Sequence, residues 1–304
     1  MTQAGFKEKE NRTTSPENLH KPEFVGFSEN EKKWLQGLLD SFGLPLSNVK
    51  RFRKASVEEL KQQGMEGTAN VAAFWDPVAQ EIVIIEPENR SEHELRRVLY
   101  HELSHGVLDP FSYVEIDFVK MEPVIENGAP KFRPEMLAVF KTPQNVLRFV
   151  QFMQYSVVIA IETGVYVDGY QKILGQKFQS LQGDLQILIR KASDPKISPE
   201  DKAKIDKEIK DKEADLQITM GALFKETWAI IMEQAFIKPE GLKQKANAQK
   251  KAWDEQGFEK EAYHSIYDEA QYFLRLFYGT DDAGVDKKRV ESKKYVEKNL
   301  YPTQ

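Results

Sequence analysis

Two histidines and a glutamate near residue 100 have the types and spacing of a metal centre. The segment from Leu99 to Leu108 reads LYHELSHGVL, so His101, Glu102 and His105 form an H-E-x-x-H sequence within an amphipathic helical pattern. Residues four apart lie on one face of a helix, so both imidazoles can reach one ion. Glu102 lies beside that face, where it can take a proton from metal-bound water. Because the chain has only 5 histidines, this pattern is expected by chance in roughly one such chain in a hundred.

A hydrolytic zinc centre needs a third protein ligand and an open position for water. The chain has no cysteine and no suitably placed third histidine, so we expect a carboxylate. The candidates are Glu226 in KETWAIIMEQAF, Glu233 seven residues later, and Glu162 at the end of an apolar segment. Glu226 and Glu233 share a helical face, but they would lie ~10 Å apart along its axis and could not easily reach one ion together. Zn²⁺ would lower the pKa of its water from ~15.7 towards ~7, and Glu102 would pass the proton to the leaving amine.

These residues resemble those of the gluzincin class of zinc metallopeptidases, whose ligands are the two histidines of H-E-x-x-H and a glutamate on a later helix. The segment E-T-W-A-x3-E-x-A-F is similar to the E-x-x-A segment that supplies the glutamate in the anthrax lethal factor-like branch. The resemblance covers about residues 70–110 and 220–236, and it implies that Glu226, rather than Glu233, is the third ligand. The gap between His105 and Glu226 is longer than in that branch.

The same branch uses a tyrosine near the metal, and no tyrosine shortly precedes Glu226 in this chain. Tyr166 and Tyr170 in GVYVDGY and His264 further on are candidates to donate a hydrogen bond to the oxyanion or to contact substrate. Tyr263 and Tyr267 are additional candidates near His264, and the sequence does not choose among them.

The elements before the motif are predicted to place it on a helix beside a small sheet. From Ser28, a serine N-cap with Glu31 three residues later forms a capping box and predicts a helix that ends near Gly43. Segments 70–75 and 81–86, joined by a short turn, are predicted to be strands, and the run IVII at 82–85 is expected to be buried on both faces. In zinc peptidases, a strand pair followed directly by the H-E-x-x-H helix places an edge strand above the metal. Such an edge can bind an extended peptide as an added strand. A short helix is expected over residues 56–63, and a second capping box, Ser91 with Glu94, starts the motif helix.

After the motif, the sequence predicts a buried helix over 145–163 and then an antiparallel helical hairpin. A heptad seam resembling a coiled coil runs along the first arm, and breaks at Asp194-Pro195 and Ser198-Pro199 precede a return helix. Each arm of ~22 residues would reach ~33 Å. A further helix begins near 221 and stops at Pro239, and another is expected over about 257–278. The seam consists of Leu174, Phe178, Leu181, Leu185 and Leu188.

The predicted fold is α+β and mainly helical, a zincin-like metallopeptidase domain with a small sheet before the motif helix. Its predicted parts are a disordered leader (1–27), an N-terminal part with the motif (28–169), the hairpin insertion (170–220), C-terminal helices with the third ligand (221–280) and a charged tail (281–304).

Composition narrows the function classes. The 304-residue chain has 40% hydrophobic and 30% charged residues, and its net charge of −5 argues against a general nucleic-acid binder. It has no apolar run of membrane-spanning length and no signal-peptide pattern, so we expect a cytoplasmic protein that does not act on a membrane.

The sequence thus predicts a zinc-dependent metallopeptidase that acts on a peptide or protein substrate. The alternative is a non-catalytic binding or regulatory protein on a zincin scaffold, with a protein partner at the hairpin. Hydrolysis of a substrate other than a peptide is a third reading of the same motif.

Overall fold

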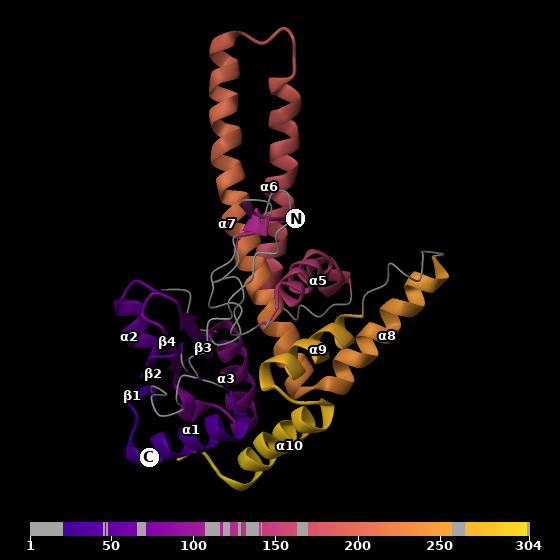
Figure 1. Ribbon diagram of the computed structural model, residues 1–304. Helices are drawn as coiled ribbons and strands as arrows, with labels where there is room; N and C mark the ends of the chain where they lie inside the picture. Colours follow the sequence, from indigo (N-terminus) through magenta and orange to yellow (C-terminus); the bar gives the residue numbers. More distant parts are fainter. Residues whose placement is uncertain are drawn as a thin grey trace, which may run out of the picture.

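A small mixed sheet lies beside a larger set of helices, and two of these helices project from the body as a long hairpin (Figure 1). The fold is α+β and mainly helical, as the sequence predicts. The computed structural model describes residues 21–44, 46, 48–65, 71–106, 116–117, 122–126, 129–131, 140, 142–162, 170–256 and 265–302.

The sheet has the strand order β1-β2-β4-β3. The first three strands in this order are parallel, and β3 pairs antiparallel with β4 at one edge. The predicted strand pair is therefore confirmed as β3 and β4, and every residue of β4 is buried. Ile82 and Ile84 belong to the main core, whereas Val83 and Ile85 pack with Leu60 on the other face. The strands are β1 (Glu23–Val25), β2 (Arg51–Ala55), β3 (Ala73–Asp76) and β4 (Glu81–Ile85).

Two strands of this sheet were not predicted. Strand β1 falls within the segment expected to be a disordered leader, and that expectation is wrong for residues 23–25. Strand β2 reads RFRKA. Its charged residues do not suggest a buried strand, although Phe52 is fully buried. Arg51 and Arg53 are accommodated because both form ion pairs with the buried Glu81, at 2.6 and 3.2 Å.

The helices before the motif begin where their capping residues predict. Helix α1 (Glu29–Phe42) has the complete capping box of Ser28 and Glu31 and ends at Gly43 in the left-handed conformation. Helix α2 (Val57–Gln62) follows the N-cap Ser56. At α3 (Glu92–Gly106), Ser91 accepts the backbone N–H of Glu94, but the Glu94 carboxylate pairs with Arg90, so only half of the predicted box is present.

The hairpin arms are α6 (Tyr170–Ala192) and α7 (Pro199–Ile237), which pack together along the projecting part (Figure 1). All four leucines of the predicted seam are buried, and Phe178 packs against the core. The sequence predicted a separate helix after residue 220, but α7 continues unbroken for 39 residues. One helix therefore forms the return arm and also carries Glu226 into the body.

Three helices follow α7: α8 (Pro239–Glu255), α9 (Ile266–Tyr278) and α10 (Asp282–Lys298). Helix α8 was not predicted, because Pro239 was taken only as a stop signal, whereas it also occupies the first turn of a new helix. The charged segment after residue 280, expected to have no core pattern, forms α10 and packs on α1, α3 and α9.

Helix α5 (Pro143–Glu162) matches the predicted buried helix in extent. Between α3 and α5, the described residues form only the short pairs β5 (Ile116–Asp117) with β6 (Glu122–Pro123), and β7 (Ile125–Glu126) with β8 (Ala129–Pro130). Among the described residues, no helix is both long enough and apolar enough to cross a membrane.

Candidate metal centre

Helix α3 presents one face to α7, and this face carries the two motif histidines. Arg97, His101 and His105 recur every four residues, so they form a single row along the helix. The imidazole rings of His101 and His105 have centroids 5.0 Å apart. Beside this row, the fully buried Tyr100 stacks on Phe236 of α7 with centroids 4.1 Å apart, which holds the two helices together.

The rotation of α7 is fixed by an aromatic cluster on its other side. Trp228 is completely buried, and its ring lies 5.1 Å from that of Phe149 on α5 and 5.6 Å from that of Phe273 on α9. Residues two apart on a helix point about 200° apart around the axis. Because Trp228 points into this cluster, Glu226 points towards α3.

The result is a compact group of three potential ligands. Nε2 of His101 lies 3.6 Å from one carboxylate oxygen of Glu226, and Nε2 of His105 lies 3.5 Å from the other. One ligand atom from each of the three residues lies within 4.8 Å of the others. The structure thus brings together three residues, of which the first and last are 125 positions apart, and this group could hold a metal ion.

The electrostatics of this group favour positive charge. Burial acts to lower the pKa of His101, but the carboxylates of Glu226 and Glu233 outweigh it and raise the pKa to about 10. His105 is also buried, and burial lowers its pKa to about 4 despite the opposing effect of Glu226. Two carboxylates therefore surround His101, where a cation is stabilised.

Glu102 is placed to act as a base beside this group. Its side chain is buried, and burial together with the charge of Glu226 raises its pKa to about 8, although His101 and a backbone hydrogen bond from Trp75 oppose the shift. A carboxylate with a pKa near neutrality is a stronger proton acceptor than an exposed one. Trp75 belongs to β3, so Glu102 lies between the histidine row and the edge strand.

The close approach of α3 to β3 depends on a small residue. A Cβ atom on Gly106 would lie 3.1 Å from the Trp75 ring, which is tighter than ordinary contact. Glycine at this position lets the end of the motif helix approach the edge strand, and Glu102 can then reach the Trp75 backbone.

Glu233 was an alternative metal ligand, and the structure places it elsewhere. Its carboxylate lies 3.1 Å from Nδ1 of His101, the ring nitrogen that does not face Glu226. The same carboxylate pairs with Arg97 at 3.3 Å. The sequence analysis missed this contact of Arg97, although its position one turn before His101 was a usable signal.

The other candidates cannot be placed at the site. Glu162 is the last residue of α5, and Tyr170 the first of α6, but the side chains of both lie outside the described part of the structure. Tyr166 and His264 also lie outside the described residues. Tyr267, a further candidate on α9, lies 5.8 Å from the ammonium group of Lys243, measured from its ring centroid.

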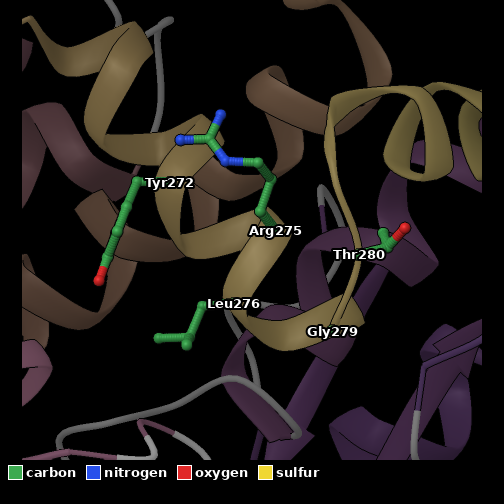
Figure 2. Close-up of a pocket in the computed structure, with 5 residues that line it drawn as sticks. All are labelled: Tyr272, Arg275, Leu276, Gly279 and Thr280. Carbon is green, nitrogen blue, oxygen red and sulfur yellow. The ribbon is translucent and has the colours of Figure 1, made fainter.

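A cavity of about 320 Å³ lies away from these ligands, at the C-terminal end of α9. Figure 2 shows Tyr272, Arg275 and Leu276 on the helix, with Gly279 and Thr280 in the turn that follows. Arg275, the charged residue of this cavity, forms an ion pair with Asp282 at 2.7 Å. Because its charge is matched within the fold, we assign no chemistry to this cavity.

No protein-family model, no curated protein and no solved structure matches this chain.

Proposed function

We propose that this protein is a zinc-dependent metallopeptidase with a zincin-like arrangement of its site. The observation that carries the proposal is the convergence of His101, His105 and Glu226 next to the buried Glu102. Two imidazoles and one carboxylate are a ligand set that catalytic zinc uses, with the fourth position left for water or substrate.

The distances from Glu226 to the two histidines are close to those of a zinc site. Two ligand atoms ~2.0–2.1 Å from one ion at tetrahedral angles lie about 3.4 Å apart. The two distances from the Glu226 oxygens to the histidine nitrogens, 3.6 and 3.5 Å, need little adjustment to meet this value. A bound zinc ion would polarise the scissile carbonyl and lower the pKa of a water molecule at the open position.

The chain's own residues would handle the proton. A Glu102 carboxylate oxygen would accept a proton from the attacking water and then deliver it to the leaving nitrogen. The Trp75 backbone lies near the Glu102 carboxylate and would help to orient it. Burial of Glu102 strengthens its interaction with nearby charges, because water is largely excluded.

A peptide substrate is favoured by the edge strand. The backbone N–H of Ile85 donates to the carbonyl of Ala72, so every second residue of β3 pairs with β4 and the intervening Ala73 and Trp75 direct their backbone groups outwards. An extended peptide can add to such an edge as a further strand. The Trp75 N–H is used by Glu102, so the peptide would pair with the remaining outward groups.

Replacing Glu102 with Gln tests the function directly. We expect E102Q to keep its zinc, because the three ligands are intact, and to lose 10²–10⁴-fold in cleavage of an unfolded protein such as casein. Zinc content is measured by atomic absorption and cleavage by mass spectrometry of the products. The matched variant E94Q changes a glutamate of the same helix that pairs with Arg90, and it should cleave like the wild type. If E102Q cleaved the substrate as well as the wild type, Glu102 would not be the general base.

One observation favours the alternative of a binding protein that acts through the hairpin. Four isoleucines of its arms are strongly exposed, with Ile218 the most exposed at 70%. If the protein binds zinc, yet neither cleaves protein mixtures nor loses any function in E102Q, this alternative replaces the peptidase. The four residues are Ile173, Ile187, Ile189 and Ile218.

A further inference from the structure

We propose that Arg97 and Glu233 form a clamp that fixes the orientation and tautomer of His101 for metal binding. This inference rests on the proposed metal centre, and it assigns to Glu233 a positioning role rather than a place among the ligands. It depends on the register between α3 and α7, which is visible only in the folded chain.

The clamp is one end of a series of contacts between basic residues of α3 and acidic residues of α7, which run antiparallel. Along α3 the row runs Arg97, His101, His105, and along α7 the acidic residues run in the opposite direction, with Glu233 opposite the start of the row and Glu226 opposite its end. Each carboxylate contacts two successive members of the row. The basic and acidic side chains therefore alternate along the interface.

His101 is held from both of its ring nitrogens. Nε2 faces Glu226, whereas Nδ1 lies 3.1 Å from a Glu233 oxygen. A carboxylate at Nδ1 accepts a hydrogen bond, so the proton of the neutral ring stays on Nδ1 and the Nε2 lone pair remains available to an ion. Within the part of the chain that the structure describes, no carboxylate lies at Nδ1 of His105, so the two histidines are held by different means.

Arg97 completes the arrangement by fixing Glu233. One guanidinium nitrogen lies 3.3 and 3.4 Å from the two carboxylate oxygens. Glu233 is buried, with a side chain 9% exposed, whereas that of Arg97 is 45% exposed and can reach solvent. A buried carboxylate that lost its cationic partner would be less stable as an anion.

The chain contains a second ion pair that closely matches Arg97–Glu233 and has no described contact with the metal ligands. Arg148 and Glu269 join α5 to α9 at 2.7 Å, and their side chains are 42% and 12% exposed. E269Q therefore removes a similar charge from a similar environment. It controls for the general cost of breaking a half-buried ion pair.

The experiment measures zinc affinity by competition with a chromogenic chelator in wild type, E233Q, R97Q and E269Q. Loss of an outer partner of a ligand histidine lowers metal affinity roughly 10- to 100-fold. We expect that loss in E233Q, a smaller loss in R97Q, and wild-type affinity in E269Q. The ¹⁵N chemical shifts of the His101 ring should show protonated Nδ1 in the zinc-free wild type at high pH and a mixture of tautomers in E233Q.

The outcomes separate this inference from the proposed function. If E233Q had the zinc affinity and the His101 tautomer of the wild type, the clamp would be overturned and the metal centre would remain. The clamp would also be overturned if E269Q lost as much zinc affinity as E233Q. A wild-type protein that binds no zinc would overturn both. Because Arg97 is largely exposed, R97Q tests the same clamp if E233Q does not fold.

Discussion

At the scale of single residues, the candidate metal centre has a part that one helix supplies and a part that the packing of α7 against α3 brings to it. His101 and His105 need only the helical repeat to share a face, with Glu102 beside it, and their capped helix forms where expected. Glu226 is 121 residues from His105, so its position depends on how α7 packs, and only a family resemblance pointed to it. The contact of Glu233 with His101 was beyond prediction, since it requires the register of two helices to within one turn.

Removing Glu226 tests the third ligand. We expect E226A to lose zinc affinity by more than the roughly 10- to 100-fold that loss of an outer partner costs, because one of three protein ligands is absent. The zinc-to-protein ratio after dialysis measures the effect. The control E213A changes an exposed glutamate on the hairpin part of the same helix.

The same measurement on E162A examines the remaining carboxylate candidate. An unchanged ratio in E226A together with a lost ion in E162A would transfer the ligand role to Glu162. Loss of zinc in E226A alone would leave the assignment as proposed.

At the scale of elements, the sequence predicted helices and strands whose patterns are simple and missed those whose patterns are mixed. Strand β4 is apolar after Glu81 and was predicted, whereas β2 alternates Arg with buried side chains and was not. Helix α7 changes from a charged arm to an apolar core segment, and this change in composition was mistaken for a boundary. No proline lies between residues 200 and 238, and this was the available sign that the helix continues.

Two glycines in helices are expected to respond in opposite ways to alanine. A Cβ atom on Gly183 of α6 would meet nothing within 4 Å, so G183A should stabilise the hairpin by about 0.4–1 kcal/mol by restricting the unfolded chain. A Cβ atom on Gly37 of α1 would clash with the Tyr295 hydroxyl, which donates to the Trp34 carbonyl at 2.9 Å. G37A should therefore destabilise the protein by about 1–3 kcal/mol.

Urea denaturation followed by circular dichroism measures both changes. Hydrogen exchange at the amides of α6 separates a local gain in the hairpin from a global one. If both alanine variants shifted stability in the same direction, the packing described for α1 and α10 or the open face of α6 would be incorrect.

At the scale of the whole molecule, residues near 300 join the sheet and α1 into one unit with the motif helix. The indole N–H of Trp34 donates to the Asn299 carbonyl at 2.8 Å, and the backbone N–H of Tyr301 donates to Glu92, the first residue of α3. The sequence did not predict this packing because the buried stripe of α10 mixes polar and apolar residues. That stripe consists of Val285, Arg289, Ser292 and Val296.

Glu31 is the point at which these connections meet, and it predicts a pH dependence of stability. Burial acts to raise the pKa of this carboxyl, but bonds from Lys54, the Ser28 backbone and Tyr301 outweigh it and hold the pKa below its ordinary value of 4.5. A carboxyl whose pKa is lowered on folding stabilises the fold fully above its unfolded pKa, and this contribution is lost as the pH falls through the folded pKa.

We therefore expect E31Q to lower the free energy of unfolding by about 1–3 kcal/mol at pH 7, since Lys54 would lose a buried charged partner 2.9 Å away. The difference between wild type and E31Q should begin to shrink near pH 4.5 and should disappear as the pH falls through the lower folded pKa of Glu31, because the wild-type carboxyl becomes protonated there. Y301F, which removes the hydroxyl that donates to Glu31 at 2.9 Å, should cost about 1 kcal/mol at pH 7. Urea titrations at pH 7, 5 and 4 measure these differences. A gap between wild type and E31Q that stayed constant over this range would show that the ionised carboxylate is not what holds residue 301 and β2 to α1.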